Sequence, residues 1–375
     1  MAYSFLHTAD WQIGKRFGSF PGTEKPAVLR DARLRAVDRL AEIAIAKGCS
    51  AVLVAGDIFD AETVPEALTG QLMARLGAYS ALSWHLLPGN HDPARAGGVW
   101  AAITATGVPL NVHVHAAPRA IEIAAGVVLL PAPLMAKRTS IDPTAWMDEA
   151  PSPLGTVRIG LAHGSVQGFG SAGEASVPID PARAKAAGLA YLALGDWHGT
   201  MRISDRVWYS GTPEPDGFRD NNPGNALIVR VDGSAVPQVE RVPTAHFTWL
   251  RRAQRLDAAD GLAPIEAEVA ALGSAAQRCL MALELSGVVT LSELSRIEAR
   301  LDKLTPQLFH LASDTAALDA VAATSDLEAL SAPALEEIAA RLKAMGEGSA
   351  GDAAVARRAL RRLFAFARQA EAAQS

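Results

Sequence analysis

Five short clusters rich in Asp, Asn, Gln and His recur along the N-terminal part of the chain. They are His7–Gln12, Gly56–Asp60, Gly89–Asp92, His163–Gly164 and Gly195–Gly199. Each cluster follows a short apolar run that is typical of a β-strand. The carboxyl ends of strands in an α/β sheet share one edge, where such folds place their sites. Oxygen and nitrogen ligands without sulfur suit manganese, magnesium or iron, with zinc as an alternative. The clusters therefore predict a metal site.

The elements that would position these clusters alternate between strands and helices. Strands are predicted at 3–7, 51–55, 83–87, 127–131, 157–162, 190–194, 208–210 and 226–231, and helices at 27–47 and 65–77. This order predicts a mixed sheet covered by helices. Segments 99–109 and 137–153 are predicted to be long loops. The His113 and His115 pair lies in an alternating segment, which favours a solvent-facing strand over a metal site.

The pattern changes near residue 245. Strands at 246–254, 278–286 and 307–313 alternate with helices at 263–271 and 291–304, which predicts a small α+β domain. Two alanine-rich helices follow, at 332–345 and 352–372. The last one carries a basic stripe of Arg357, Arg358, Arg361, Arg362 and Arg368 opposite an apolar face. It is either an ordinary amphipathic helix packed on its own chain or a docking helix for a partner.

The composition is that of a globular protein. Of 375 residues, 49% are apolar and 20% are charged, which excludes wholesale disorder. The net charge of −5 argues against coating nucleic acid through bulk charge. Two cysteines, Cys49 and Cys279, exclude a disulfide framework and a cysteine-based zinc site. The first residues show no basic region followed by an apolar stretch, so we expect no signal peptide, and no apolar run reaches the roughly 18 residues of a membrane span. We therefore expect a cytoplasmic protein with no membrane partner.

The clusters, taken in order, resemble the motifs of the calcineurin-like metallophosphoesterases. That family carries D-x-H, G-D-x-x-D, G-N-H-D/E, a lone H and G-H-x-H. Here they stand as Asp10-Trp11-Gln12, Gly56 to Asp60, Gly89 to Asp92, His163, and Gly195 to His198. The HTAD opening, GDIFD and YSGTPEP (209–215) resemble the SbcD-type DNA exonucleases, including the YhaO-like branch. Motif-level resemblance covers about residues 1–230.

The resemblance implies an α/β fold with a four-layer αββα metallophosphoesterase sandwich at 1–244. A small α+β capping domain would follow at 245–320. A helical C-terminal tail at 321–375 would dock on a partner ATPase. The second of these regions coincides with the change of pattern near residue 245.

Roles carry over from the family by position and imply two divalent metal ions, with manganese preferred and magnesium or iron as alternatives. Asp10, Gln12 and His198 would bind the first ion, and Asn90, His163 and Asp196 the second, while Asp57 bridges both. His91 would be the catalytic histidine. The carboxylate of Asp60 would orient it. In such a site, a water shared by the two metals attacks phosphorus in line.

This chain departs from the family at two ligand positions, because Gln12 and Asp196 each replace a histidine. The ligand charge from Asp10, Asp57 and Asp196 becomes −3 where the usual set gives −2. Two imidazoles are exchanged for oxygen ligands, which favours harder ions such as manganese or magnesium. Two interpretations follow. Either the centre stays binuclear with an altered metal preference, or the first metal or the whole centre is lost.

The predicted function is a metal-dependent DNA phosphodiesterase, an exo- or endonuclease of DNA repair. It would be the nuclease subunit of an SbcCD-like complex, with DNA and an SbcC-like coiled-coil ATPase as partners, and the resemblance also suggests a homodimer. Two alternatives stay open. One is a phosphoesterase acting on a small phosphodiester or phosphomonoester. The other is a non-catalytic scaffold with a degenerate metal site.

Overall fold

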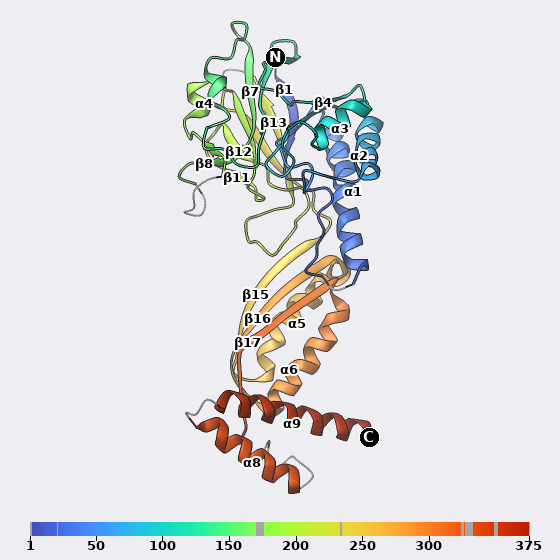
Figure 1. Ribbon diagram of the computed structural model, residues 1–375, viewed down its shortest axis with the longest axis vertical. Helices are drawn as coiled ribbons and strands as arrows, with labels where there is room; N and C mark the ends of the chain where they lie inside the picture. The colour runs from blue at the N-terminus through green and yellow to red at the C-terminus, as the bar shows by residue number, and fades with distance from the viewer. Residues whose placement is uncertain are drawn as a thin grey trace. The chain divides into compact units, whose positions relative to one another are not determined.

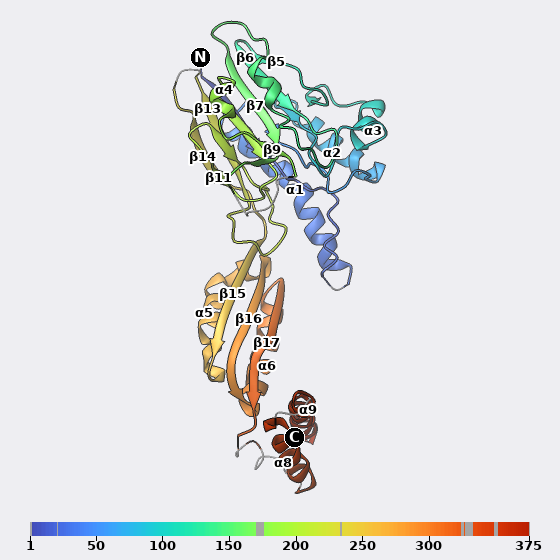
Figure 2. The ribbon, with the colours of Figure 1, turned by 60° about the vertical axis from the view of Figure 1, so that its left-hand side comes forward.

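The computed structural model describes residues 2–20, 22–169, 176–232, 235–323, 326, 333–348 and 352–374. The chain divides into two compact units, Met1–Phe247 and Thr248–Ser375. Several strands of the first unit are labelled in Figures 1 and 2.

The first unit contains two six-stranded sheets. One has the order β14-β13-β1-β2-β3-β4. Its strands are β1 (Tyr3–Thr8), β2 (Ala51–Val54), β3 (Ser83–Leu86), β4 (Val112–Val114), β13 (Asn225–Val231) and β14 (Gln238–Pro243). Strands β1 to β4 run parallel, whereas β13 pairs antiparallel with both β1 and β14.

The other sheet has the order β11-β12-β10-β7-β6-β5. Its strands are β5 (Ile121–Ala124), β6 (Val127–Ala132), β7 (Val157–His163), β10 (Tyr191–Gly195), β11 (Met201–Arg202) and β12 (Val207–Tyr209). The four central strands are parallel, and the outer pairs are antiparallel. A separate small ladder joins β8 (Ser165–Val166) to β9 (Pro178–Ile179).

The two sheets pack face to face, and helices cover their outer faces. Phe5, Leu53, Leu129, Leu161 and Tyr191 belong to the apolar layer between the sheets. The first sheet is covered by α1 (Glu24–Ala46), α2 (Glu66–Ala78) and α3 (Val99–Thr106), and the second by η1 (Ala145–Asp148) and α4 (Arg183–Ala186). Strands buried on both faces are apolar throughout, as in the run Ala51–Val54. The predicted αββα sandwich is confirmed.

The structure corrects the prediction of a long loop at 99–109, where it has helix α3. Gly98 precedes the helix, and Trp100 and Ile103 lie one turn apart and are buried in the core of the first sheet's outer face. Three buried residues, Val99, Trp100 and Ile103, in a helix of 8 residues give too short a period to recognise in sequence. Segment 137–153 is likewise interrupted by η1.

The prediction of a solvent-facing edge is right for His113 and wrong for His115. The side chain of His113 is exposed, whereas His115 is buried with a 6% exposed fraction. The Nε2 atom of His115 lies 3.0 Å from Nδ1 of His85 on the neighbouring strand. The His115 ring also stacks on His85, with ring centroids 5.2 Å apart.

The second unit has the predicted order of strand, helix, strand, helix, strand. Strands β15 (Thr248–Leu256), β16 (Cys279–Thr290) and β17 (His310–Val321) form a parallel sheet. Its helices are α5 (Ala263–Leu272), α6 (Leu291–Leu304), α8 (Pro333–Glu347) and α9 (Ala353–Gln374), with 3₁₀ turns η2 (Ala259–Leu262), η3 (Gly273–Arg278) and η4 (Thr305–Gln307). Thr290 and Glu293 form a capping box that starts α6. Strand β17 begins and ends later than predicted.

The apolar face of α9 packs on its own chain, since Leu360 and Phe364 are buried against Leu291 and Ala320. On the basic side, Arg358 and Arg362 are exposed, and the side chain of Arg368 lies outside the described part. No helix in the described ranges has the length and apolar character required to cross a membrane. Cys49 and Cys279 are both buried and unpaired with each other.

Candidate metal centre

Four of the predicted ligand positions lie in left-handed backbone. The φ angles are 54° at Asp10, 50° at Gln12, 53° at Asp57 and 101° at Asp196. Such conformations cost non-glycine residues about 1–3 kcal/mol each and cluster at functional sites. Main-chain hydrogen bonds hold them here, from Asp10 N to Gly56 O (3.0 Å) and from Gln12 N to Asp57 O (2.9 Å). The loops after β1 and β2 therefore fix each other.

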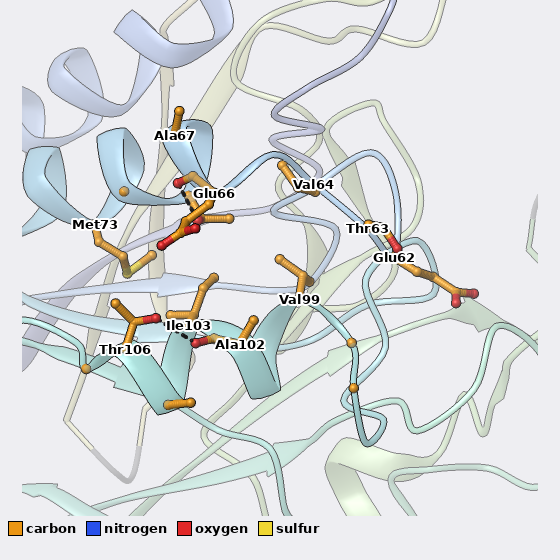
Figure 3. A pocket seen from close by; sticks show the side chains of 16 residues that line it. Glu62, Thr63, Val64, Glu66, Ala67, Met73, Val99, Ala102, Ile103 and Thr106 are labelled. Carbon is orange, nitrogen blue, oxygen red and sulfur yellow. Dashed lines mark hydrogen bonds between the residues drawn. The ribbon is translucent and has the colours of Figure 1, made fainter.

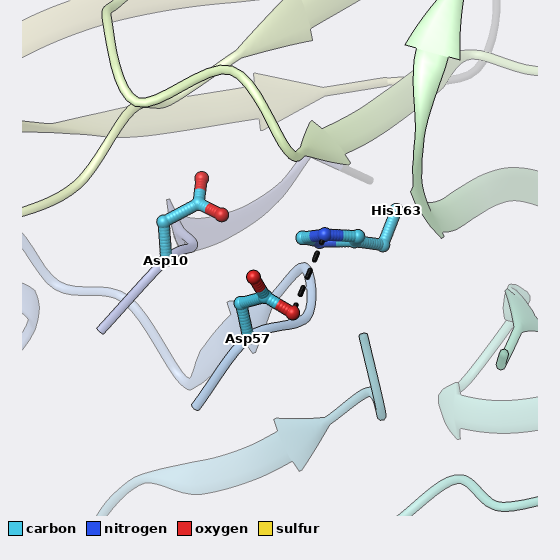
Figure 4. A group of neighbouring side chains, drawn as sticks. All are labelled: Asp10, Asp57 and His163. Carbon is cyan, nitrogen blue, oxygen red and sulfur yellow. Dashed lines mark ion pairs between the residues drawn. The ribbon is translucent and has the colours of Figure 1, made fainter. Parts of the chain in front are cut away.

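Asp10, Asp57 and His163 converge at this edge of the sheets (Figure 4). One ligand atom from each lies within 4.8 Å of the others, and all three side chains are buried. His163 Nδ1 lies 2.8 Å from the carbonyl oxygen of Ala55, so Nδ1 carries the proton and Nε2 faces the carboxylates. Within the described residues, this is the one group of three such side chains with converging ligand atoms.

The electrostatics of the three residues fit a divalent cation. Burial raises the pKa of Asp10 to about 6, although His198 and His163 oppose the change. Burial alone would lower the pKa of His163, but Asp57, Asp10 and Asp196 outweigh it and raise that pKa to about 9. Buried carboxylates at this density need a positive partner. A set of oxygen and nitrogen donors without sulfur matches manganese, magnesium or iron.

Asn90 and Asp196 lie beside His163, as the resemblance implied for the second metal. Asn90 Oδ1 is 3.1 Å from His163 Nε2, and Asp196 Oδ1 is 3.8 Å from the same atom. The main-chain N–H of Asp196 donates to Asp10 Oδ1 at 3.2 Å. Ser165 Oγ donates to Asp196 Oδ2 at 2.5 Å and leaves Oδ1 turned toward His163.

Gln12 contacts Asp57 through its amide nitrogen, whereas His198 contacts Asp216. Gln12 Nε2 donates to Asp57 Oδ2 at 2.9 Å, so the amide supports the Asp57 carboxylate. Ligation by Gln12 would need the amide to turn and present Oε1. His198 Nδ1 lies 3.1 Å from Asp216 Oδ2. Burial alone would lower the pKa of His198, but Asp216 and, to a smaller extent, the charge of Asp10 outweigh it and raise that pKa.

His91 lies at the open side of the site. Its main-chain N–H donates to Asp57 Oδ1 at 2.9 Å, and its Nε2 is 3.9 Å from Asp57 Oδ2. Nδ1 lies 3.1 Å from the main-chain carbonyl oxygen of Asp60. The carboxylate of Asp60 instead faces Lys15 Nζ at 3.7 Å. The predicted orienting carboxylate is therefore corrected to a carbonyl, because the turn after β2 directs the Asp60 side chain away from His91.

Sequence reasoning missed Arg33, which lies beneath the site. This arginine in α1 is buried and donates to the carbonyl oxygens of Asp10 (3.0 Å), Trp11 (2.7 Å) and Glu214 (2.8 Å). It carries no motif. One signal was available, because Arg33 lies four residues from both Leu29 and Val37, on the apolar stripe of the helix.

Asp92 stood in the predicted Gly89–Asp92 cluster without a role of its own, and Asp216 was missed as part of the site. Asp92 Oδ1 accepts from Gly89 N (2.7 Å) and Oδ2 from Phe59 N (3.0 Å), which ties the loops after β2 and β3 together. Burial, with Asp57 nearby, raises the pKa of Asp92 well above its usual value. Asp216 comes directly after YSGTPEP, and that adjacency was its signal.

Gly89 allows Asp57 to take its place in the site. A Cβ atom on Gly89 would lie 2.3 Å from Asp57 Oδ1 and 2.4 Å from Asp57 N. Real Cβ atoms do not approach so closely, so any side chain here would displace the Asp57 carboxylate. The G-N-H-D motif therefore needs its glycine for close approach.

A hollow of 820 Å³ lies between α2 and α3 (Figure 3). Val64, Met73, Val99 and Ile103 are among its lining residues. None of the predicted ligands lines it, although Glu62 and Gly97 at its rim follow two of the ligand clusters along the chain.

Comparison with known proteins agrees with this geometry. Residues 3–165 match the family described as calcineurin-like phosphoesterase. A stretch of 95 residues is 38% identical to the SbcD component of the SbcCD nuclease from Rhodobacter capsulatus, covering 24% of this chain and 22% of that protein. This chain therefore matches less than a quarter of that relative's length. The crystal structure of TT1561 of Thermus thermophilus superposes with a TM-score of 0.41 and 13% identity, over 65% of this chain and 100% of that one, which is too distant to inform function.

Proposed function

Because residues 3–165 match the calcineurin-like phosphoesterase family, we propose that the protein is a metal-dependent phosphodiesterase that cleaves DNA. The observation that carries the proposal is the position of Asp57. Its carboxylate lies 3.5 Å from His163 Nε2, accepts from Gln12 and from the main chain of His91, and is buried. A single carboxylate thus joins both predicted ligand sets to the predicted catalytic histidine.

In this proposal Asp10, Gln12 and His198 hold one divalent ion, Asn90, His163 and Asp196 hold a second, and Asp57 is shared. Bound ions would supply Lewis acidity and a hydroxide nucleophile at neutral pH. Manganese fits the oxygen-rich set best, with magnesium and iron as alternatives.

Besides the proposed metal ligands, His91 is the residue of this chain that would contact the phosphodiester. The Asp60 carbonyl accepts from Nδ1, so Nε2 is the atom that faces the substrate side. The side chain is 38% exposed, which lets Nε2 reach a phosphodiester entering from solvent. In its protonated form it would donate a hydrogen bond to a phosphoryl oxygen and a proton to the leaving oxygen.

DNA is favoured over a small phosphoester by two observations. The relative that aligns with this chain over 95 residues is named as a nuclease. The second unit, Thr248–Ser375, adds a domain that hydrolysis of a small ester does not need. We assign 245–320 as a capping domain and 321–375 as the docking region for an SbcC-like coiled-coil ATPase. The exposed Arg358 and Arg362 of α9 provide a basic surface for such contact. A homodimer is part of the same proposal.

The test incubates the purified chain with manganese and three substrates: labelled single-stranded DNA, labelled double-stranded DNA and a chromogenic small phosphodiester. We expect cleavage of DNA, and its loss on Asp57→Asn. Cleavage of the small ester alone would favour a small-molecule phosphoesterase. Binding of fewer than one divalent ion per chain, measured on the same preparation, would favour a scaffold with a degenerate site.

A further inference from the structure

We propose that Asp216 is a positioning residue that holds His198 in place for metal binding, an inference that rests on the proposed function. Asp216 lies outside all five ligand clusters. Its side chain is 6% exposed, and Oδ2 lies 3.1 Å from His198 Nδ1 and 3.1 Å from Lys15 Nζ. The carboxylate is therefore shared between an imidazole and an ammonium group.

The contact favours one tautomer of His198. Nδ1 lies at ion-pair distance from a carboxylate, which can only accept, and this favours the form with the proton on Nδ1. Nε2 then keeps its lone pair and is the atom that can bind an ion. A carboxylate behind a ligating histidine also limits the rotation of the ring and increases its basicity as a ligand.

Lys15 extends this arrangement to the other side of the site. Its ammonium group lies 3.7 Å from Asp60 Oδ1, and the carbonyl oxygen of Asp60 is 3.1 Å from His91 Nδ1. A continuous path therefore runs from His198 through Asp216, Lys15 and Asp60 to His91. Both histidines are oriented from outside the ligand set, by residues of loops that are distant in sequence.

Because Gln12 stands where the family has a histidine, the support of His198 by Asp216 becomes more important. Among the predicted ligands of the first ion, His198 is the one imidazole that remains, since Gln12 replaces the other. The Gln12 amide donates to Asp57 in the structure and is a weak ligand in any orientation. The first ion would then depend on Asp10, Asp57 and a well-oriented His198.

Three variants separate the effect of the Asp216 charge from the effect of its hydrogen-bond acceptor. Asp216→Leu removes both the charge and the acceptor, whereas Asp216→Asn keeps an acceptor of the same shape and loses the charge. Asp220→Asn is the matched control, because it makes the same change four residues away at an exposed position. Thermal melting of each metal-free variant reports whether the change acts on the fold itself.

The measurement is calorimetric titration with Mn²⁺, together with the electron paramagnetic resonance signal of free Mn²⁺. In wild type we expect two ions per chain. In Asp216→Leu one ion should bind about 10–100-fold more weakly while the other keeps its affinity. Asp216→Asn should show a smaller weakening of the same ion, and Asp220→Asn none. A residue that merely supports the fold would weaken both ions together.

Two results would overturn a proposal. Wild-type binding of two ions with both affinities unchanged in Asp216→Leu overturns this inference and leaves the proposed function standing. Fewer than one ion per wild-type chain overturns the proposed function itself. If Asp216→Leu does not fold, Asp216→Asn decides alone, and an unchanged affinity there also overturns the inference.

Discussion

Acidification should destabilise the first unit through the buried pair of His85 and His115. Their Nδ1 and Nε2 atoms lie 3.0 Å apart, so the two rings share one proton. A further proton would leave a positive charge on one of the two buried rings. His113 stacks on His85 with ring centroids 5.0 Å apart, and Arg119 adds further positive charge near His115. Every ionisable group described around the pair therefore opposes its protonation.

The magnitude follows from the pKa of His115, which burial, His113 and Arg119 lower from 6.5 to about 4. Because the folded pKa lies below the unfolded one, the unfolded chain binds more protons as pH falls. The stabilisation is fully present above about pH 6.5 and is lost as pH falls toward about 4. At about pH 5 the loss is roughly 2 kcal/mol relative to about pH 7.5.

The assay is urea unfolding with EDTA present, followed by tryptophan fluorescence at about pH 7.5 and about pH 5. Six of the seven tryptophans lie in the first unit, so the signal reports on it. His115→Gln keeps a hydrogen-bonding side chain but cannot titrate, and should lose about 2 kcal/mol less than wild type. His113→Gln is the exposed control and should behave nearly as wild type. Parallel losses in wild type and His115→Gln would refute the reasoning.

Three further substitutions test the site and its support. His91→Asn should lower turnover on DNA by on the order of 100-fold while calorimetry shows unchanged manganese binding; unchanged turnover would contradict its role. Gly89→Ala should weaken manganese binding, because its Cβ would meet the bridging carboxylate at 2.3 Å, whereas Gly70→Ala, with no atom within 4 Å, should not. Arg33→Met should cost about 3 kcal/mol or more in urea unfolding by leaving buried carbonyls without a donor. The exposed Arg35→Met should stay within about 0.5 kcal/mol, and equal losses in both would speak against a supporting role for Arg33.

The ligand clusters were predictable because the residues of each cluster are neighbours in the sequence. A polar group directly after an apolar strand must lie at the sheet edge, and Asp10, Asp57 and His163 meet there. The α/β sandwich follows for the same reason, since continuous apolar runs such as Ala51–Val54 indicate strands buried on both faces.

The supporting residues were not predictable, because their contacts join distant parts of the chain. Arg33 and Glu214 are 181 residues apart, and no local pattern links them. Asp60 illustrates a second reason why a contact cannot be predicted in full from the sequence. Its nearness to His91 was correct, but whether its carboxylate or its carbonyl oxygen meets the ring depends on the backbone turn, which residue types do not specify.

At Gln12 and Asp196, the left-handed backbone sets where the side chain lies, and the residue type sets only which ligand atom it offers. Hydrogen bonds between neighbouring loops set the path of the chain at both positions. Aspartate and histidine are both among the residues that tolerate left-handed backbone. In the proposed centre, single substitutions at these positions would therefore change the metal preference while the scaffold stays folded. A centre built in this way is open to evolutionary drift between metals, and an enzyme engineer could retune it at the same two positions.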